Sequence, residues 1–142
     1  MRRFSFRLQR ALDFALLREN QKKKVVARAL QRISFLKKYT VQLETKIRTA
    51  IETSNRAIGT LEADAHRQSV LPTIEESRRI QGLLGEEEKE LHTQQEALVR
   101  LSQRRRSLES LREKRMDDFK LDRSRAEQKR IDENVSLKRD RN

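Results

Sequence analysis

The chain has no cysteine, no tryptophan, a single proline and only three glycines among its 142 residues. Without cysteine it has neither a disulfide framework nor a thiolate ligand for a metal ion. Aromatic residues make up 4% of the chain and hydrophobic residues 35%, which is too little to fill a thick core. This composition leaves two classes of protein, namely a disordered chain or long helices that bury one narrow apolar stripe.

A long apolar run is missing as well. No stretch reaches the roughly 18 residues that a membrane-spanning helix needs. The opening MRRFSFR is positively charged, but the apolar segment of about 7–15 residues that makes a secretory signal does not follow it. We therefore expect a cytoplasmic protein.

Residues suited to catalysis are scarce. The two histidines, His66 and His92, each follow a glutamate by four residues, but one imidazole with one carboxylate is too small a ligand set for a metal ion. Three scattered glycines do not build a phosphate-binding loop. We expect no enzyme activity, no metal and no cofactor.

Charge is plentiful and unevenly placed. The chain carries a net charge of +12. Residues 1–24 hold eight Lys or Arg against two acids, and residues 101–142 hold fourteen against nine. If the two ends lie side by side, the positive charge is concentrated there, which favours an acidic protein surface, a nucleic acid or an anionic lipid as partner.

Apolar residues repeat every seven positions, which predicts an all-α, left-handed coiled coil. The first half of the chain contains two such series: Leu12, Glu19, Val26, Ile33, Thr40, Ile47, Ser54 and Leu61, and Ala15, Lys22, Ala29, Leu36, Leu43, Ala50 and Ala57. The second half continues with Leu84, Leu91, Leu98, Leu101, Leu108, Leu111 and Phe119. The polar members interrupt the stripe, and such residues can set the register of a coiled coil at some cost in stability.

The lone proline, Pro72, lies near the midpoint of the chain, and proline ends or kinks a helix. Thr73 and Glu76 follow in the spacing of a capping box, which marks a helix start. These features predict one antiparallel two-helix hairpin over residues 1–142, with arms of about 5–70 and 73–137 and a bend near Pro72. A kink at Gly82–Gly85 is the alternative bend.

Three other interpretations of the chain follow from its charge and its heptad pattern: a nucleic-acid-binding protein, a membrane-surface protein and a self-associating coiled coil. Arg104, Arg105 and Arg106 suggest nucleic acid, but on a helix they fan over about 200° and form no single patch, so we expect no nucleic-acid partner. The N-terminal arginines with Phe4 and Phe6 would suit an anionic membrane surface. The third interpretation is a coiled coil that self-associates. In an intramolecular hairpin, however, the apolar stripes of the two arms already pack on each other along one line of contact, the seam, which favours a monomer.

Two terminal stretches resemble one family. The segment Phe4–Asp13, FSFRLQRALD, resembles the opening of FliJ-type flagellar export proteins, which begin with an aromatic-x-aromatic-Arg-Leu-Gln pattern. The segment Glu127–Glu133, EQKRIDE, resembles the C-terminal acid-Gln-Lys-x-x-Asp-Glu pattern of the same family. The chain length, the expected hairpin and the basic charge also agree with this family.

The resemblance implies a small coiled-coil hairpin of a type III secretion system, at the cytoplasmic face of the bacterial inner membrane. Such proteins enter a hexameric export ATPase ring, promote its assembly and activity, and couple it to the cytoplasmic domain of a membrane export-gate protein. Export chaperones are a further implied partner. Whether the system is flagellar or a virulence apparatus stays open.

The resemblance also implies site residues. The ATPase would be bound by residues from both ends of the chain: Phe4, Phe6, Arg7, Leu8, Gln9, Leu12, Gln128, Lys129, Asp132 and Glu133. The export gate would be bound by Ile80, Leu83 and Leu84, which are the nearest counterparts of the short apolar residues that the family uses beyond its bend. The aromatic residue that is usual there is missing in this chain.

Overall fold

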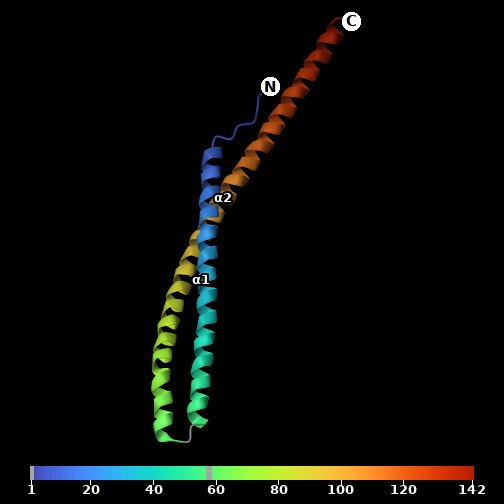
Figure 1. Ribbon diagram of the computed structural model, residues 1–142. Coiled ribbons are helices and arrows are strands. Elements are labelled where there is room, and N and C mark those ends of the chain that lie inside the picture. The colour runs from blue at the N-terminus through green and yellow to red at the C-terminus, as the bar shows by residue number, and fades with distance from the viewer. Residues whose placement is uncertain (1, 57–58) are drawn as a thin grey trace. The chain divides into compact units, whose positions relative to one another are not determined.

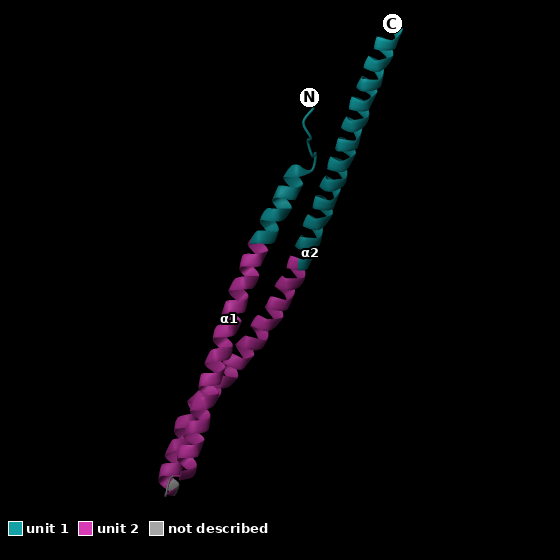
Figure 2. Cartoon of the chain, turned by 90° about the vertical axis from the view of Figure 1, so that its right-hand side faces the viewer, with its two compact units in different colours: residues 1–20, 99–142 teal, residues 21–98 magenta. Residues whose placement is uncertain are grey.

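A computed structural model describes residues 2–56 and 59–142 and contains two long helices, α1 over Gln9–Arg56 and α2 over Thr60–Asp140 (Figure 1). The described residues contain no strand, so the prediction of an all-α helical hairpin is confirmed. The chain divides into two compact units, one formed by residues 1–20 and 99–142 and the other by residues 21–98 (Figure 2). We refer to them as unit 1 and unit 2 and describe each by itself.

In unit 2, α1 and α2 pack side by side and run antiparallel. Polar contacts join residues of rising number on α1 to residues of falling number on α2, namely Lys22 to Gln94, Arg32 to Glu87, Tyr39 to Glu76 and Ser54 to Ala63. Each helix is rich in Leu, Glu, Lys, Arg and Gln, which favour a helical backbone. Burial of one stripe against the partner helix stabilises both.

The predicted bend near Pro72 is wrong, and so is the alternative at Gly82–Gly85. The chain changes direction between Arg56 and Thr60. Pro72, Gly82 and Gly85 all lie inside α2. The backbone N–H of Ala63 donates to the carbonyl of Gly59 at 3.0 Å, which makes Gly59 the residue that precedes the first turn of α2. Glu62 then places a negative charge at the positive end of the helix dipole. The arms therefore span 9–56 and 60–140, in place of 5–70 and 73–137.

Proline is tolerated within α2 because the seam residues on both sides of it stay packed. Val70 and Ile80 are buried, at 6% and 4% exposure, and Ser77 between them is also buried, whereas Pro72 is exposed. The backbone carbonyl that loses its hydrogen bond to a proline nitrogen lies one turn earlier, at the exposed Gln68. Thr73 and Glu76 form no capping box, since both lie within the helix.

The heptad pattern of the first arm is confirmed. The buried residues of α1 fall on the two predicted series: Leu12, Ala15, Glu19, Val26, Ala29, Ile33, Thr40, Leu43 and Ser54. On α2 the predicted Leu84, Leu91 and Leu98 are half-buried, and they continue the spacing of Val70 and Ser77. Leu61 departs from the pattern and is 86% exposed, because it belongs to α2 and not to the first arm. Ala57 lies outside the described residues.

The polar seam residues have hydrogen-bond partners. Lys22 Nζ donates to Gln94 Oε1 at 2.7 Å. The hydroxyl of Thr40 donates to the carbonyl of Leu36 at 2.9 Å, and the Ser54 hydroxyl donates to that of Ala63 at 3.4 Å. Among the described residues, no buried side-chain nitrogen or oxygen lacks a hydrogen-bond partner. The interruptions of the stripe are therefore accommodated without buried unpaired polar groups.

In unit 1, the start of α1 packs on α2 through Leu12 and Ala15, which are buried, and Leu101 and Leu108, which are half-buried. The helix begins at Gln9 and not near residue 5. Residues 120–142, which include the last part of α2, are exposed throughout. No helix of the described residues combines the length and the apolar character that crossing a bilayer requires.

Candidate functional site

The segment before α1, residues 2–8, packs on α2 within unit 1. The rings of Phe4 and Phe119 lie 5.7 Å apart with an interplanar angle of 57°, a tilted geometry that aromatic pairs prefer. Phe4 and Phe6 are both half-buried. Together with α2 the segment surrounds an open cavity of about 890 Å³, lined by residues 2–8 and by Leu111, Arg115, Asp118, Phe119 and Asp122. The N-terminal aromatic motif is thus anchored on the second helix.

The backbone at Gln9 explains why the segment leaves the helical path. The N–H of Gln9 donates to the carbonyl of Phe6 at 3.0 Å, which is the hydrogen bond of a tight turn. The N–H of Leu12 then donates to the carbonyl of Leu8 at 2.9 Å, which is the first bond of α1. The turn places Phe4 and Phe6 beside α2 and ends the regular pairing of the two helices.

Charged side chains surround this cavity. Arg2, Arg3 and Arg7 come from the N-terminal segment and Arg115 from α2, whereas Asp118 and Asp122 are the acids. Four cations against two carboxylates make the surroundings positive. A local excess of positive charge attracts acidic partners toward it. The half-buried phenylalanines are poorly placed to insert into lipid, so the cavity suits an acidic protein surface better than a membrane.

The remaining N-terminal residues that the family resemblance implies have different environments. Arg7 and Leu8 are exposed, the latter at 39%. Gln9 is half-buried, and its amide donates to the carboxylate of Asp13 at 2.9 Å. Leu12 is only 4% exposed and lies in the seam. Leu12 therefore stabilises the helix pair and offers little surface to a partner.

The C-terminal members of the set share one exposed stretch of α2. Gln128, Lys129, Asp132 and Glu133 are all exposed, and the Gln128 amide donates to the carboxylate of Asp132 at 3.0 Å. The N-terminal segment lines α2 only from Leu111 to Asp122, so these four residues lie further along the helix. The two halves of the predicted ATPase site belong to one unit, but no direct contact joins them.

The three residues predicted to bind the export gate are unequally accessible. Ile80 is 4% exposed and packs in the seam of unit 2, and Leu84 is half-buried. Leu83 is 39% exposed and lines an open groove beside α1. Of the three, Leu83 is the residue that a partner can reach.

Sequence reasoning missed two features. The heptad pattern marks Glu19 as an interruption of the seam, whereas in the structure it forms a buried polar cluster with Ser102 and Arg105. Phe35 was not singled out, although it is 68% exposed on α1. An aromatic residue between the seam positions Ile33 and Leu36, in a chain with few aromatics, was the available indication of a surface contact.

Among residues 2–56 and 59–142, no group of three or more His, Cys, Asp or Glu side chains could hold a metal ion. One open cavity lies between α1 and α2 in unit 2, and another lies between the N-terminal segment and α2 in unit 1. The geometry therefore suits binding of another macromolecule. Comparisons of the chain with family models, with curated proteins and with solved structures gave no match, so its relation to FliJ-type proteins stays a prediction from the two terminal motifs.

Proposed function

We propose that this chain is a component of a bacterial flagellar type III export apparatus that binds the hexameric export ATPase through unit 1. In this role it promotes assembly and activity of the ATPase and couples it to the export gate. It acts without a cofactor, in the cytoplasm and at the cytoplasmic face of the inner membrane. Export chaperones are further candidate partners, and the chain alone is expected to be monomeric.

One observation carries the proposal, namely the packing of the N-terminal motif on α2 in the unit that also contains the C-terminal motif. Phe4 contacts Phe119, and Gln128 and Lys129 lie beyond it on the same helix with exposed side chains. A partner that surrounds this part of the chain would meet both motifs.

The contact would combine steering with short-range hydrogen bonds. The positive surroundings of Arg2, Arg3, Arg7 and Arg115 would accelerate encounter with acidic loops of the ring. The amide of Gln128 and the ammonium group of Lys129 would then form directed hydrogen bonds, which are stronger where one partner is charged. Phe4 and Phe6 fix the N-terminal segment in place, so that less conformational entropy is lost on binding.

The contact with the export gate is proposed to lie in unit 2 and to use Leu83. Ile80 and Leu84 then support the backbone beneath it, because they pack toward α1. This assignment keeps the ATPase contact and the gate contact in different units of the chain.

A binding titration tests the ATPase contact. Because the chain has no cysteine, a Gln95→Cys variant carries a single dye on an exposed position of unit 2. Fluorescence anisotropy would follow its binding to the purified export ATPase. Lys129→Ala is expected to weaken binding about tenfold, equivalent to ~1.4 kcal/mol, and Lys120→Ala, an exposed lysine outside the motif, should leave it unchanged. Equal effects of the two variants, or no binding at all, would refute the proposed contact.

A further inference from the structure

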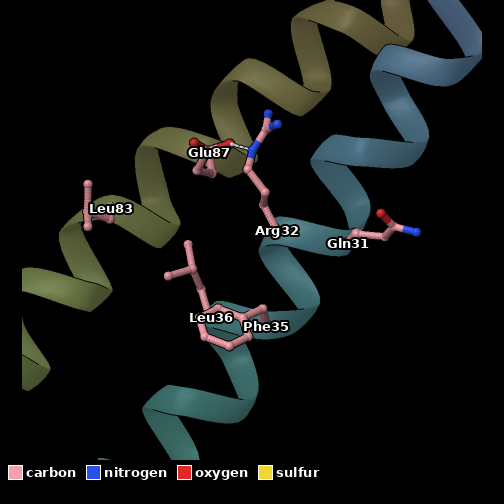
Figure 3. Close-up of a pocket in the computed structure, with 6 residues that line it drawn as sticks. All are labelled: Gln31, Arg32, Phe35, Leu36, Leu83 and Glu87. Atoms are coloured by element: carbon pink, nitrogen blue, oxygen red, sulfur yellow. Dashed lines mark hydrogen bonds and ion pairs between the residues drawn. The ribbon is translucent and has the colours of Figure 1, made fainter.

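Unit 2 carries an open apolar groove of about 450 Å³ on one face of its two helices (Figure 3). Its walls are formed by Gln31, Arg32, Phe35 and Leu36 of α1 and by Leu83 and Glu87 of α2. Phe35 is 68% exposed and Leu83 is 39% exposed. An ion pair between Arg32 and Glu87, 3.4 Å long, crosses from one helix to the other at the edge of the groove.

Packing of the two helices does not explain the exposed Phe35 at this groove. Phe35 lies outside the seam, which Ile33 and Leu36 supply on either side of it. Its ring stacks on that of Tyr39, at 6.4 Å between centroids and 9° between planes, and the Tyr39 hydroxyl donates to Glu76 at 3.5 Å. The exposed ring is thus held in place by neighbours. An ordered, exposed aromatic side chain beside an apolar groove is typical of a protein-binding surface.

The two sides of the groove carry opposite charge. Residues 21–56, the α1 part of unit 2, contain ten Lys or Arg against two Glu, whereas residues 59–98 contain four against nine Asp or Glu. Arg28 and Arg32 precede Phe35 by seven and three residues, so they share its side of α1. On α2, Glu86, Glu87 and Glu90 follow Leu83 by three, four and seven residues. The groove therefore has a basic edge on α1 and an acidic edge on α2.

We infer that this groove binds one amphipathic α-helix of a partner protein. Its apolar stripe would cover Phe35 and Leu83, an acidic edge would face Arg28 and Arg32, and a basic edge would face the glutamates of α2. A groove between two antiparallel helices accepts a third helix lengthwise, with apolar side chains at every third or fourth position as anchors. The opposite charges of the two edges would select a helix that carries one acidic and one basic edge.

A second copy of the chain is a poorer fit. Two copies placed face to face would set groove against groove, which would leave the space between Phe35 and Leu83 unfilled. The partner helix, by contrast, supplies a ridge. Leu83 is also the proposed contact with the export gate. The identity of the partner therefore rests on the proposed function, whereas the expected chemistry of the partner helix rests on the groove alone.

The test uses three synthetic helical peptides of about three heptads, which is long enough for measurable helicity. All have leucine at the apolar positions and differ in their edges: one glutamate edge and one lysine edge, two glutamate edges, or two lysine edges. Peptides with the two edges exchanged are unsuitable controls, because a helix turned end for end presents its edges the other way round. Binding is measured by calorimetry with the full chain at about 0.15 M salt, where exposed charges are screened over roughly 8 Å.

The mixed-edge peptide is expected to bind about tenfold more tightly than either uniform peptide, a difference of the size that a like-charge edge imposes. Phe35→Ser and Leu83→Ser should each weaken its binding by about tenfold or more, and Val41→Ser, at a 60% exposed position of the same helix outside the groove lining, should not. Helix content by circular dichroism confirms that each variant is folded.

Other results would overturn the inference. Tightest binding of the two-glutamate peptide, unaffected by Phe35→Ser, would mean attraction by net charge alone. Failure of all three peptides to bind would exclude a helix as occupant. A dimer in sedimentation that Phe35→Ser dissociates would identify a second copy as the occupant. None of these outcomes bears on the ATPase contact, which lies in unit 1.

Discussion

The guanidinium group of Arg105 donates to the carboxylate of Glu19, a residue that is 2% exposed in the seam of unit 1. Ser102 donates a second hydrogen bond to the same carboxylate at 2.9 Å, and Arg105 also donates to Glu109 at 2.7 Å. The hydrogen bonds that Arg105 donates to Glu19 and then to Glu109 raise the pKa of Arg105 above its ordinary value. A buried charge is tolerated here because its partners come from the facing helix.

The two partners of this ion pair should respond unequally to substitution. Arg105→Leu removes the guanidinium that donates from the facing helix to the buried Glu19 carboxylate, whereas Glu19→Leu leaves Arg105 with Glu109 and partial access to water. We therefore expect Arg105→Leu to lower the free energy of unfolding more than Glu19→Leu does. The double variant should recover much of the loss, since an apolar pair replaces the buried charge. Urea unfolding of the three variants measures these differences, and equal losses for both single variants would contradict the account.

Two residues of α1 that lie close in sequence should differ sharply in their contribution to stability. Ile33 is 5% exposed in the seam, so Ile33→Ala should cost about 2–4 kcal/mol in the free energy of unfolding. Phe35→Ala should cost less than about 0.5 kcal/mol, because the Phe35 side chain is 68% exposed. Thermal and denaturant unfolding followed by circular dichroism compare the two. A large loss for Phe35→Ala would place that ring in the core.

Glu76 should titrate below the ordinary range of a glutamate. Its pKa is lowered chiefly by the hydrogen bonds from Arg79, at 3.0 and 2.7 Å, and further by the hydroxyl of Tyr39. A depressed carboxyl pKa stabilises the fold at pH values above the unfolded-state pKa, and this contribution is lost as the pH falls through the folded-state pKa. An NMR titration of the Glu76 side chain should show the depression, and Arg79→Leu should move the pKa up toward its ordinary value. An unchanged pKa in that variant would exclude Arg79 as the cause.

Replacement of Pro72 by alanine should stabilise the protein. Proline within a helix is about 3 kcal/mol less favourable than alanine, and Pro72 is exposed inside α2. Pro72→Ala should therefore raise the free energy of unfolding by about 2–3 kcal/mol. Gly82→Ala is the matched comparison, with a gain of about 1 kcal/mol, since a Cβ atom there would meet nothing within 4 Å. If Pro72→Ala abolished the hairpin, the result would indicate that the chain bends at Pro72 and would contradict a continuous α2.

The helical class and the seam of the first arm could be predicted from sequence because positions that are buried every seven residues are mostly occupied by apolar side chains. The position of the bend could not. Pro72 is a strong breaker of isolated helices, but packing of Val70 and Ile80 overrides it. The actual turn before Thr60 contains Gly59, a weaker indication that resembles an isolated glycine within a helix.

The candidate sites were less predictable than the fold. The N-terminal motif predicts roles for Phe4 and Phe6, but the packing of Phe4 on Phe119 depends on a turn at Gln9 that no residue pattern specifies. The resemblance implies Ile80 as a contact of the export gate, but its position in the seam leaves it only 4% exposed. The groove at Phe35 joins residues from two helices, so it required knowledge of which residues face each other across unit 2.

The rate of ATP hydrolysis by the cognate export ATPase tests the central claim most directly. It should be measured with the full chain, with a chain lacking residues 1–12, with Phe4→Ser/Phe6→Ser, and with Phe14→Ser as the control aromatic, which is 56% exposed in unit 1 outside the motif. The account predicts that the full chain and Phe14→Ser stimulate turnover and ring formation and that the other two do not. Stimulation that survives the loss of residues 1–12, or no stimulation by the full chain, would contradict it.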